Sequence, residues 1–164
     1  MPNHCHNRVT LYSSGNDTNE SRAQIQKIKQ IFEDENCFGQ IIPEPDWLNT
    51  PLMSKDVSYW LNEKRGEVGE LPQYVDGAFG KQLRFRSTDR VDDRWYDWRL
   101  ANWDTKWDAY DVEIIDEDPD CMEIQFDTAW SPPEAICHAL REQYPDLAIS
   151  WFYDEPGEEI AGYL

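Results

Sequence analysis

Two segments near the N-terminus carry different hydrophobic periodicities. Residues 7–13 alternate, with Val9 and Leu11 on one face, which predicts a half-buried β-strand ending at the turn-forming residues 14–16. Residues 19–35 instead repeat apolar side chains every three or four positions, which predicts an amphipathic helix. The apolar positions of this helix are Ile25, Ile28, Ile31 and Phe32, and its capping candidates are Asp17, Thr18 and Asn19.

The last third of the chain predicts a hairpin, a helix and a final strand. Ser131 precedes Pro132-Pro133-Glu134, a sequence typical of a helix start with serine as N-cap and proline in the first turn. The helix then carries Ile136 and Leu140 and stops before Pro145. The other predicted elements are a strand at residues 110–115, an acidic turn at residues 116–120, a strand at residues 121–127 and a strand at residues 147–153.

The middle of the chain is less regular. Prolines at positions 43, 45 and 51 limit Ile41-Ile42 to a short edge segment at most. Residues 46–93 are rich in glycine, proline and mixed charge, and we interpret them as an insertion with helical pieces around residues 57–64 and a strand at residues 82–86. A short helix is predicted at residues 94–100.

The predicted order is β-α-(insertion)-β-β-α-β. This order is typical of an α+β domain of the ferredoxin-like, split βαβ type. We therefore expect residues 1–164 to form a single domain: a four-stranded antiparallel sheet, with helices near residues 20–34 and 132–143 on one face and the insertion after the first helix.

Charge is the most informative part of the composition. The chain has 164 residues and a formal net charge of -18. The excess is concentrated after residue 107, where residues 108–164 hold 16 acidic side chains and one basic one, Arg141. Such a field repels nucleic acid and anionic membranes and attracts basic partners. A simpler interpretation is that the charge serves solubility.

The N-terminus and the cysteines indicate a compartment. Residues 1–5 lack the apolar region of a signal peptide, and no apolar run approaches the roughly 20 residues that span a bilayer. We expect a cytoplasmic protein. The cysteines, which show no C-x-x-C spacing, are therefore expected to be reduced thiols. They are Cys5, Cys37, Cys121 and Cys137.

Motifs at both ends of the chain resemble a known family. They are Met1-Pro2-Asn3 with Cys5 and Asn7, then Asn102-Trp103 and Thr105-Lys106-Trp107-Asp108, then Thr128-Ala129-Trp130-Ser131-Pro132-Pro133, and finally Tyr144-Pro145, Glu155, Gly157 and Ala161-Gly162. Together they resemble the YubB ferredoxin-like domain family, over about residues 1–12 and 95–164. Two positions depart from the pattern: His4 stands where the family usually has Trp, and Asp104 where it has Gly. The resemblance implies a ferredoxin-like fold and a plasmid or prophage setting. It implies no catalytic residue.

The predicted hairpin suggests an acidic binding surface. If its apolar residues face the helices, its alternating carboxylates face outward, at the sheet face where RNA-recognition modules place aromatic and basic residues. Carboxylates there would repel RNA or DNA and could imitate nucleic acid toward a basic protein. The residues of this predicted surface are Asp111, Glu113, Asp116, Glu117, Asp118, Glu123 and Asp127.

A Trp-rich loop offers an alternative site. Its aromatic and polar side chains could line a pocket for a small molecule or peptide, or they could be structural, with the tryptophans buried against the sheet. The residues of this alternative are Asn102, Trp103, Lys106, Trp107 and Trp130.

Other chemistry finds little support in the sequence. The chain has no G-x-S-x-G elbow, H-E-x-x-H helix, Walker loop or dinucleotide fingerprint, so we predict neither enzymatic activity nor a cofactor. His4 and His6 flank Cys5, but structural packing of Cys5 explains this cluster better than metal binding, and we predict no metal site. The function expected is that of a non-enzymatic binding protein that engages a basic, nucleic-acid-binding protein. Neither direct nucleic-acid binding nor membrane binding is expected, and the oligomeric state is left open.

Overall fold

The structure is a computed structural model that describes residues 3–14, 18–47, 50, 73–77, 80–84 and 94–164. Its contacts divide the chain into two compact units. The first unit comprises Met1–Pro43 and Trp98–Leu164, and the second comprises Glu44–Asp97. None of the described helices is long and apolar enough to cross a membrane.

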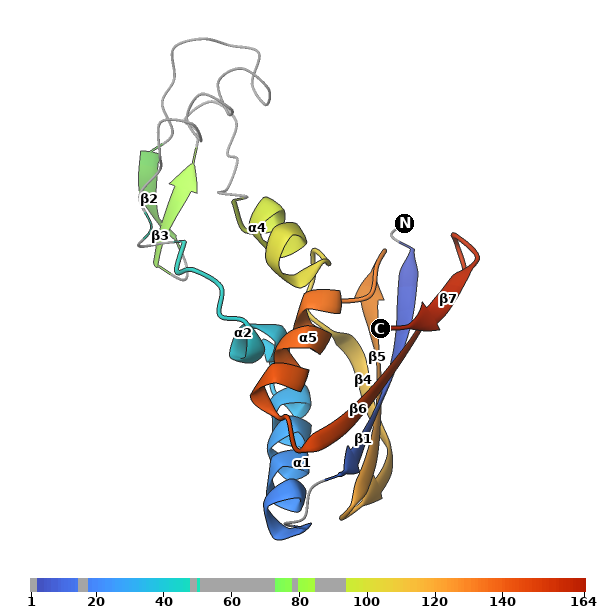
Figure 1. Ribbon diagram of the computed structural model, residues 1–164. Coiled ribbons are helices and arrows are strands. Elements are labelled where there is room, and N and C mark those ends of the chain that lie inside the picture. The colour runs from blue at the N-terminus through green and yellow to red at the C-terminus, as the bar shows by residue number, and fades with distance from the viewer. Residues whose placement is uncertain (1–2, 15–17, 48–49, 51–72, 78–79, 85–93) are drawn as a thin grey trace. The chain divides into compact units, whose positions relative to one another are not determined.

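The first unit is built on an antiparallel sheet of five strands, in the order β4-β5-β1-β6-β7. The first four have the strand order of the split βαβ arrangement, so the ferredoxin-like α+β fold is confirmed. The fifth, β7, was not predicted. It extends the sheet beyond β6 at the edge opposite β4 (Figure 1). The strands are β1 (His4–Ser13), β4 (Tyr110–Asp118), β5 (Cys121–Ala129), β6 (Leu147–Glu155) and β7 (Ile160–Tyr163).

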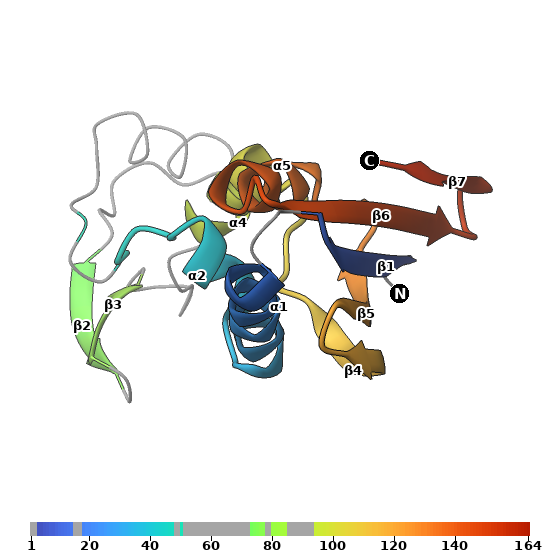
Figure 2. The ribbon, with the colours of Figure 1, turned by 60° about the horizontal axis from the view of Figure 1, so that its bottom comes forward.

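The described helices are α1 (Thr18–Glu33), α2 (Cys37–Ile41), α4 (Arg94–Trp103) and α5 (Glu134–Gln143). Helices α1 and α5 lie on the same side of the sheet, as predicted (Figures 1 and 2). Helix α2 corrects the short edge segment predicted at Ile41-Ile42. Cys37, Phe38 and Ile41 are buried on one face of this helical turn, and that burial outweighs the tendency of Ile to form strands.

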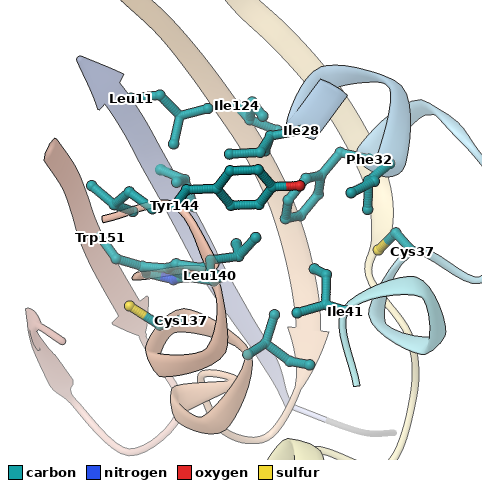
Figure 3. Close-up of a cluster of buried hydrophobic side chains, with 14 of the residues drawn as sticks. Leu11, Ile28, Phe32, Cys37, Ile41, Ile124, Cys137, Leu140, Tyr144 and Trp151 are labelled. Atoms are coloured by element: carbon teal, nitrogen blue, oxygen red, sulfur yellow. The ribbon is translucent and has the colours of Figure 1, made fainter. Parts of the chain in front are cut away.

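One core lies between the sheet and the helices. Leu11 and Ile124 of the sheet meet Ile28 of α1, while Leu140 and Tyr144 come from the α5 side (Figure 3). All five are nearly inaccessible to solvent. Burial of this apolar surface holds α1 and α5 against one face only, so the other face of the sheet is left without a helix in the described part of the unit.

Two element boundaries differ from the sequence prediction. Strand β4 continues to Asp118, so most of the predicted acidic turn is strand and the reversal occurs at residues 119–120. Helix α5 begins at Glu134 with Pro133 at its N-cap position, not Ser131. The capping oxygen comes instead from Asp104, whose Oδ2 accepts a hydrogen bond from the backbone N–H of Ala135 at 2.9 Å.

In the second unit the described strands are β2 (Gln73–Gly77) and β3 (Gly80–Arg84), which form an antiparallel pair. Strand β3 overlaps the strand predicted at residues 82–86. The helical pieces predicted around residues 57–64 lie outside the described residues.

Candidate protein-binding surface

The face of the sheet turned away from the helices, here called the open face, is the candidate site. Strand register assigns residues to it, because directly paired residues share a face and neighbours along a strand alternate. On β1 and β5, for example, Val9 and Ile124 pair on the buried side, so Arg8 and Gln125 pair on the open side. The carboxylates on the open face are Glu113, Asp116, Asp118, Glu123, Asp127 and Asp154.

Two irregularities in β4 correct the predicted surface. The register shifts by one residue between Tyr110 and Glu113, and again between Ile114 and Asp116. Asp111 lies in the first shift with a left-handed φ of 51°, so simple alternation does not assign its side chain to the open face. After the second shift Glu117 is paired with the buried Met122, which places it on the helix side.

The acidic side chains on the helix side are neutralised. Lys29 of α1 donates to Glu117 Oε1 at 2.7 Å, and Arg22 of α1 donates twice to Asp120 at 2.8 Å. The hydrogen bond from Arg22 holds the pKa of the Asp120 carboxyl below its usual range, and the bond to Glu117 raises the pKa of Lys29. These partners make Glu117 and Asp120 part of the contact between α1 and the hairpin.

The open face has no such lysine or arginine partners in the described part of the chain. Among the described residues, no lysine or arginine forms an ion pair with any of its six carboxylates. Asp116 is paired directly with Glu123 across β4 and β5, and the one described side chain that donates to Glu123 is the amide of Gln125, at 2.9 Å. Like charges directly opposite each other in a sheet are destabilising. Around Asp116 and Glu123 the open face therefore concentrates negative charge that no described lysine or arginine compensates.

Histidines border this surface at the start of β1. His6 Nδ1 lies 2.6 Å from Asp127 Oδ1, and His4 Nδ1 lies 2.6 Å from the hydroxyl of Tyr110. Burial, followed by the charge of Asp127, raises the pKa of the Tyr110 phenol. In the described part of the chain, no three His, Cys, Asp or Glu side chains are grouped so that they could hold a metal ion.

A shallow hollow of about 170 Å³ lies beside His6. It is lined by His6, Asn7, Arg8, Gln125, Phe152 and Asp154. The guanidinium of Arg8 lies 5.2 Å from the centroid of the Phe152 ring, and the Tyr163 ring packs against Phe152 with a centroid distance of 5.3 Å. These residues were not among the sites predicted from the sequence. Alternation of residues 4–12 about the apolar positions Val9 and Leu11 was the signal that could have revealed the contribution of β1.

Part of the Trp-rich loop is structural. Trp103 is fully buried and its indole N–H donates to the carbonyl of Ile42 at 3.0 Å. Asn102 donates to the carbonyl of Trp98 one turn earlier in α4, at 2.8 Å. Both side chains are thus used within the fold, and the structural interpretation is confirmed for them.

The rest of the loop differs from that interpretation. Trp107 and Trp130 are 38% and 47% exposed, so they are not plugs buried against the sheet. The ammonium group of Lys106 lies 4.5 Å from the centroid of the Trp107 ring. Trp130 has a left-handed φ of 72°, and its backbone N–H is bonded to the carbonyl of Asn3. These positions are set by the turn, and the indoles face solvent at least in part.

Buried polar groups gather where β1, β5 and β6 meet this loop. Asn7 donates to Thr128 Oγ1 at 2.9 Å and accepts from the indole of Trp151 at 3.0 Å. Cys5 lies in the same region, and burial raises the pKa of its thiol to about 11. A thiol that stays protonated at neutral pH is a poor nucleophile, so this arrangement supports packing better than catalysis.

Comparisons with known proteins bear on the fold. Residues 102–164 match the family model described as the ferredoxin-like domain in Api92-like protein. Among solved structures, the crystal structure of protein Api92 from Yersinia pseudotuberculosis matches over 99% of this chain and 93% of that chain, with 12% sequence identity and a TM-score of 0.48. No curated protein sequence matches the chain. The segment from the end of α4 to the C-terminus is thus similar to a ferredoxin-like domain found in Api92-like proteins.

Proposed function

We propose that this protein is a non-enzymatic binding protein whose acidic surface engages a basic surface of another protein. The acidic surface comprises Glu113, Asp116, Asp118 and Glu123. One observation carries the proposal: on the same hairpin, the acids that face the helices have basic partners, whereas the acids of the acidic surface have none among the described residues. Charge left uncompensated in this way is available to a cationic partner.

Protection of the sheet edge explains only part of this pattern. Strand β4 is an edge strand, and charged side chains and bulges are common means of preventing an edge from pairing with another chain. Glu123, however, belongs to β5, which is paired on both sides and has no edge to protect. Its carboxylate adds repulsion opposite Asp116 without serving that purpose, which favours a role in binding.

The spacing of the carboxylates suggests what the partner normally binds. Neighbours on one face of a strand are roughly 6.5–7 Å apart, and paired residues on adjacent strands are about 5 Å apart. The result is a dense two-dimensional array of negative charge, the property by which basic proteins recognise a nucleic-acid backbone. We therefore propose a nucleic-acid-binding protein as the partner, with this chain acting as a mimic of its ligand. The resemblance to the YubB family, with its plasmid and prophage setting, favours a host or defence protein in the cytoplasm.

A second candidate is favoured by the exposure of Trp107 and Trp130, which could contact a small molecule or peptide. The two candidates differ in salt dependence. Binding through the acidic surface should weaken steeply as salt is added, whereas binding to an aromatic site should change little.

The test is capture of partners from a bacterial lysate, compared between the natural protein and a variant with Glu113→Gln, Asp116→Asn, Asp118→Asn and Glu123→Gln. We expect a basic protein that the natural chain retains at low salt, releases at high salt and loses to added duplex DNA, and that the variant does not retain.

A matched control removes four charges elsewhere, at the exposed positions Glu35, Glu142, Asp146 and Glu158, by the same carboxyl-to-amide changes. It should retain the partner nearly as well as the natural protein. If both variants lose the partner to the same extent, net charge and not the acidic surface is responsible. If both retain it as the natural protein does, the acidic surface is not the binding site. If the partner is unaffected by salt and by DNA, the mimic proposal is wrong.

A further inference from the structure

The hollow on the open face presents hydrogen-bond acceptors with few donors. The side-chain amide of Gln125 donates from Nε2 to Glu123. The side-chain oxygen of Gln125 accepts no hydrogen bond from the described residues. The Nδ1 atom of His6 is hydrogen-bonded to Asp127. The Nε2 atom of His6 has no hydrogen-bond partner among the described residues. Asp154, directly opposite His6 on β6, has no basic partner among the described residues. Asn7 also lines the hollow, but its side-chain amide already donates to Cys5 and Thr128 and accepts from Trp151.

The exception is Arg8, and its position shows what the hollow accommodates. The Arg8 guanidinium lies over the face of Phe152 and forms no ion pair within the described part of the chain. An aromatic face beside carboxylate and carbonyl oxygens is the environment that a guanidinium or ammonium group prefers. Arg8 thus occupies one side of a cation-binding environment but leaves Asp154 unpaired.

We propose that this hollow receives an arginine or lysine side chain of the partner, between Asp154 and the Phe152 ring. This inference rests on the proposed function and adds an anchoring point to it. It also gives Arg8 a role. The guanidinium of Arg8 already lies on the Phe152 ring, so the incoming cation must either displace it or bind next to it despite the repulsion between the two positive charges. Removing Arg8 should therefore strengthen the binding of a cation. If the hollow were an anion site built on Arg8, the same change would abolish binding.

The test is a titration of the full-length protein with a capped Gly-Arg-Gly peptide, followed by NMR chemical shifts of the backbone amides. We expect the largest shifts at Arg8, Gln125 and Asp154. Asp154→Asn should weaken binding by about two- to fivefold, the range of a partly exposed ion pair. Phe152→Leu should have a similar effect through loss of the cation–π contact. Arg8→Gln should tighten binding by about two- to fivefold.

Matched variants separate local from general electrostatics. Asp146→Asn and Lys27→Gln change net charge as Asp154→Asn and Arg8→Gln do, but away from the open face, and they should leave peptide binding almost unchanged. A capped Gly-Glu-Gly peptide should not bind the natural protein. Dispersed NMR spectra and unchanged melting temperatures establish that each variant is folded.

The inference is overturned if Arg8→Gln weakens or does not change the binding of Gly-Arg-Gly, or if the anionic peptide binds instead. Shifts confined to β4 and β5 near Glu113 and Asp116 would reject the hollow while leaving the proposed acidic surface intact. The acidic surface itself fails by its own test, when the variant that neutralises it still retains the partner.

Discussion

Asp116 of β4 and Glu123 of β5 are directly paired on the open face, two carboxylates with no basic side chain of the described residues between them. On the opposite side of the same hairpin, Glu117 is bonded to Lys29. A sheet gains nothing from facing like charges, which lower its stability. The residues paired with Glu123 and next to it on the open face are Thr10 and Gln125, which are uncharged, and Arg8, paired with Gln125, forms no ion pair among the described residues. The uncompensated pair is the feature from which the proposed function and the first prediction follow.

We predict that Glu123→Gln raises the free energy of unfolding by about 0.2–1 kcal/mol at low salt, because it removes the repulsion of Asp116. Asp116→Asn should have a similar effect, and the double variant should gain less than the sum, since either change alone ends the repulsion. Urea unfolding measures the three values. Added salt should shrink the gain.

The control is Glu117→Gln on the helix side, which removes the nearer of two carboxylates beside Lys29, the other being Glu33, and should leave stability unchanged or slightly lower. If Glu123→Gln destabilises the protein as much as Glu117→Gln does, the carboxylate of Glu123 has a structural partner and the argument from uncompensated charge is wrong.

A second prediction separates the tryptophans of the loop. Trp103→Ala should cost about 3–5 kcal/mol, because it empties a fully buried site and leaves the carbonyl of Ile42 without its donor. Trp130→Ala should cost much less, since its ring is 47% exposed. Chemical denaturation at one temperature gives both values. Equal losses for the two variants would contradict the difference in burial.

The elements of the sheet were predictable because their periodicity is simple. Val9 and Leu11 alternate without interruption, and the structure places both in the core. Strand β4 was harder, because its two bulges each insert a residue, and a shift of one residue moves the following side chains to the other face. Glu117 was expected with the other acids as part of a turn at residues 116–120, whereas it belongs to β4 and Lys29 holds it on the helix side.

The Trp-rich loop was only half predictable for a related reason. The same composition fits a buried plug and an exposed aromatic surface, and the burial of each ring depends on the turn that presents it. Trp103 ends a helix that packs on the core, whereas Trp130 follows β5 with a left-handed backbone conformation. No local pattern in the sequence distinguishes these two settings. Strand β7 was missed because its four residues, which include Ala161 and Gly162, do not alternate in polarity.

A third prediction concerns Asp104, which has a left-handed φ of 61° and accepts a hydrogen bond from the N–H of Ala135 at the start of α5. Asp104→Ala should cost about 1–3 kcal/mol, through loss of the cap and strain at positive φ. Asp104→Gly should cost less, about 0.5–2 kcal/mol, because glycine tolerates the left-handed conformation but still removes the carboxylate that accepts from Ala135. Thermal unfolding of the two variants decides the point. A glycine variant as unstable as the alanine variant would mean that the left-handed backbone at position 104 contributes no strain.

The last prediction concerns the buried thiols. Burial raises the pKa of Cys5 and of Cys137 from an ordinary value of 9.0 to about 11, and that of Cys37 in the same direction. A group whose pKa is raised in the folded state stabilises the fold fully below its unfolded pKa, and loses that contribution as pH rises through the folded one. The contribution of these thiols to the free energy of unfolding should therefore be at its full value below about pH 9. It should decline between about pH 9 and pH 11, because the unfolded chain releases protons that the folded chain retains.

Other groups titrate in the same range, so the decisive measurement is the difference in slope between the natural protein and Cys137→Ala. The variant loses packing at every pH, but its stability should fall less steeply from pH 9 to pH 11. Thiol labelling gives an independent check: at neutral pH the partly exposed Cys121 should react first, while Cys5 and Cys137 should react only on unfolding. Parallel slopes, or rapid labelling of Cys137 in the folded protein, would show that this thiol is not held protonated by burial against the sheet.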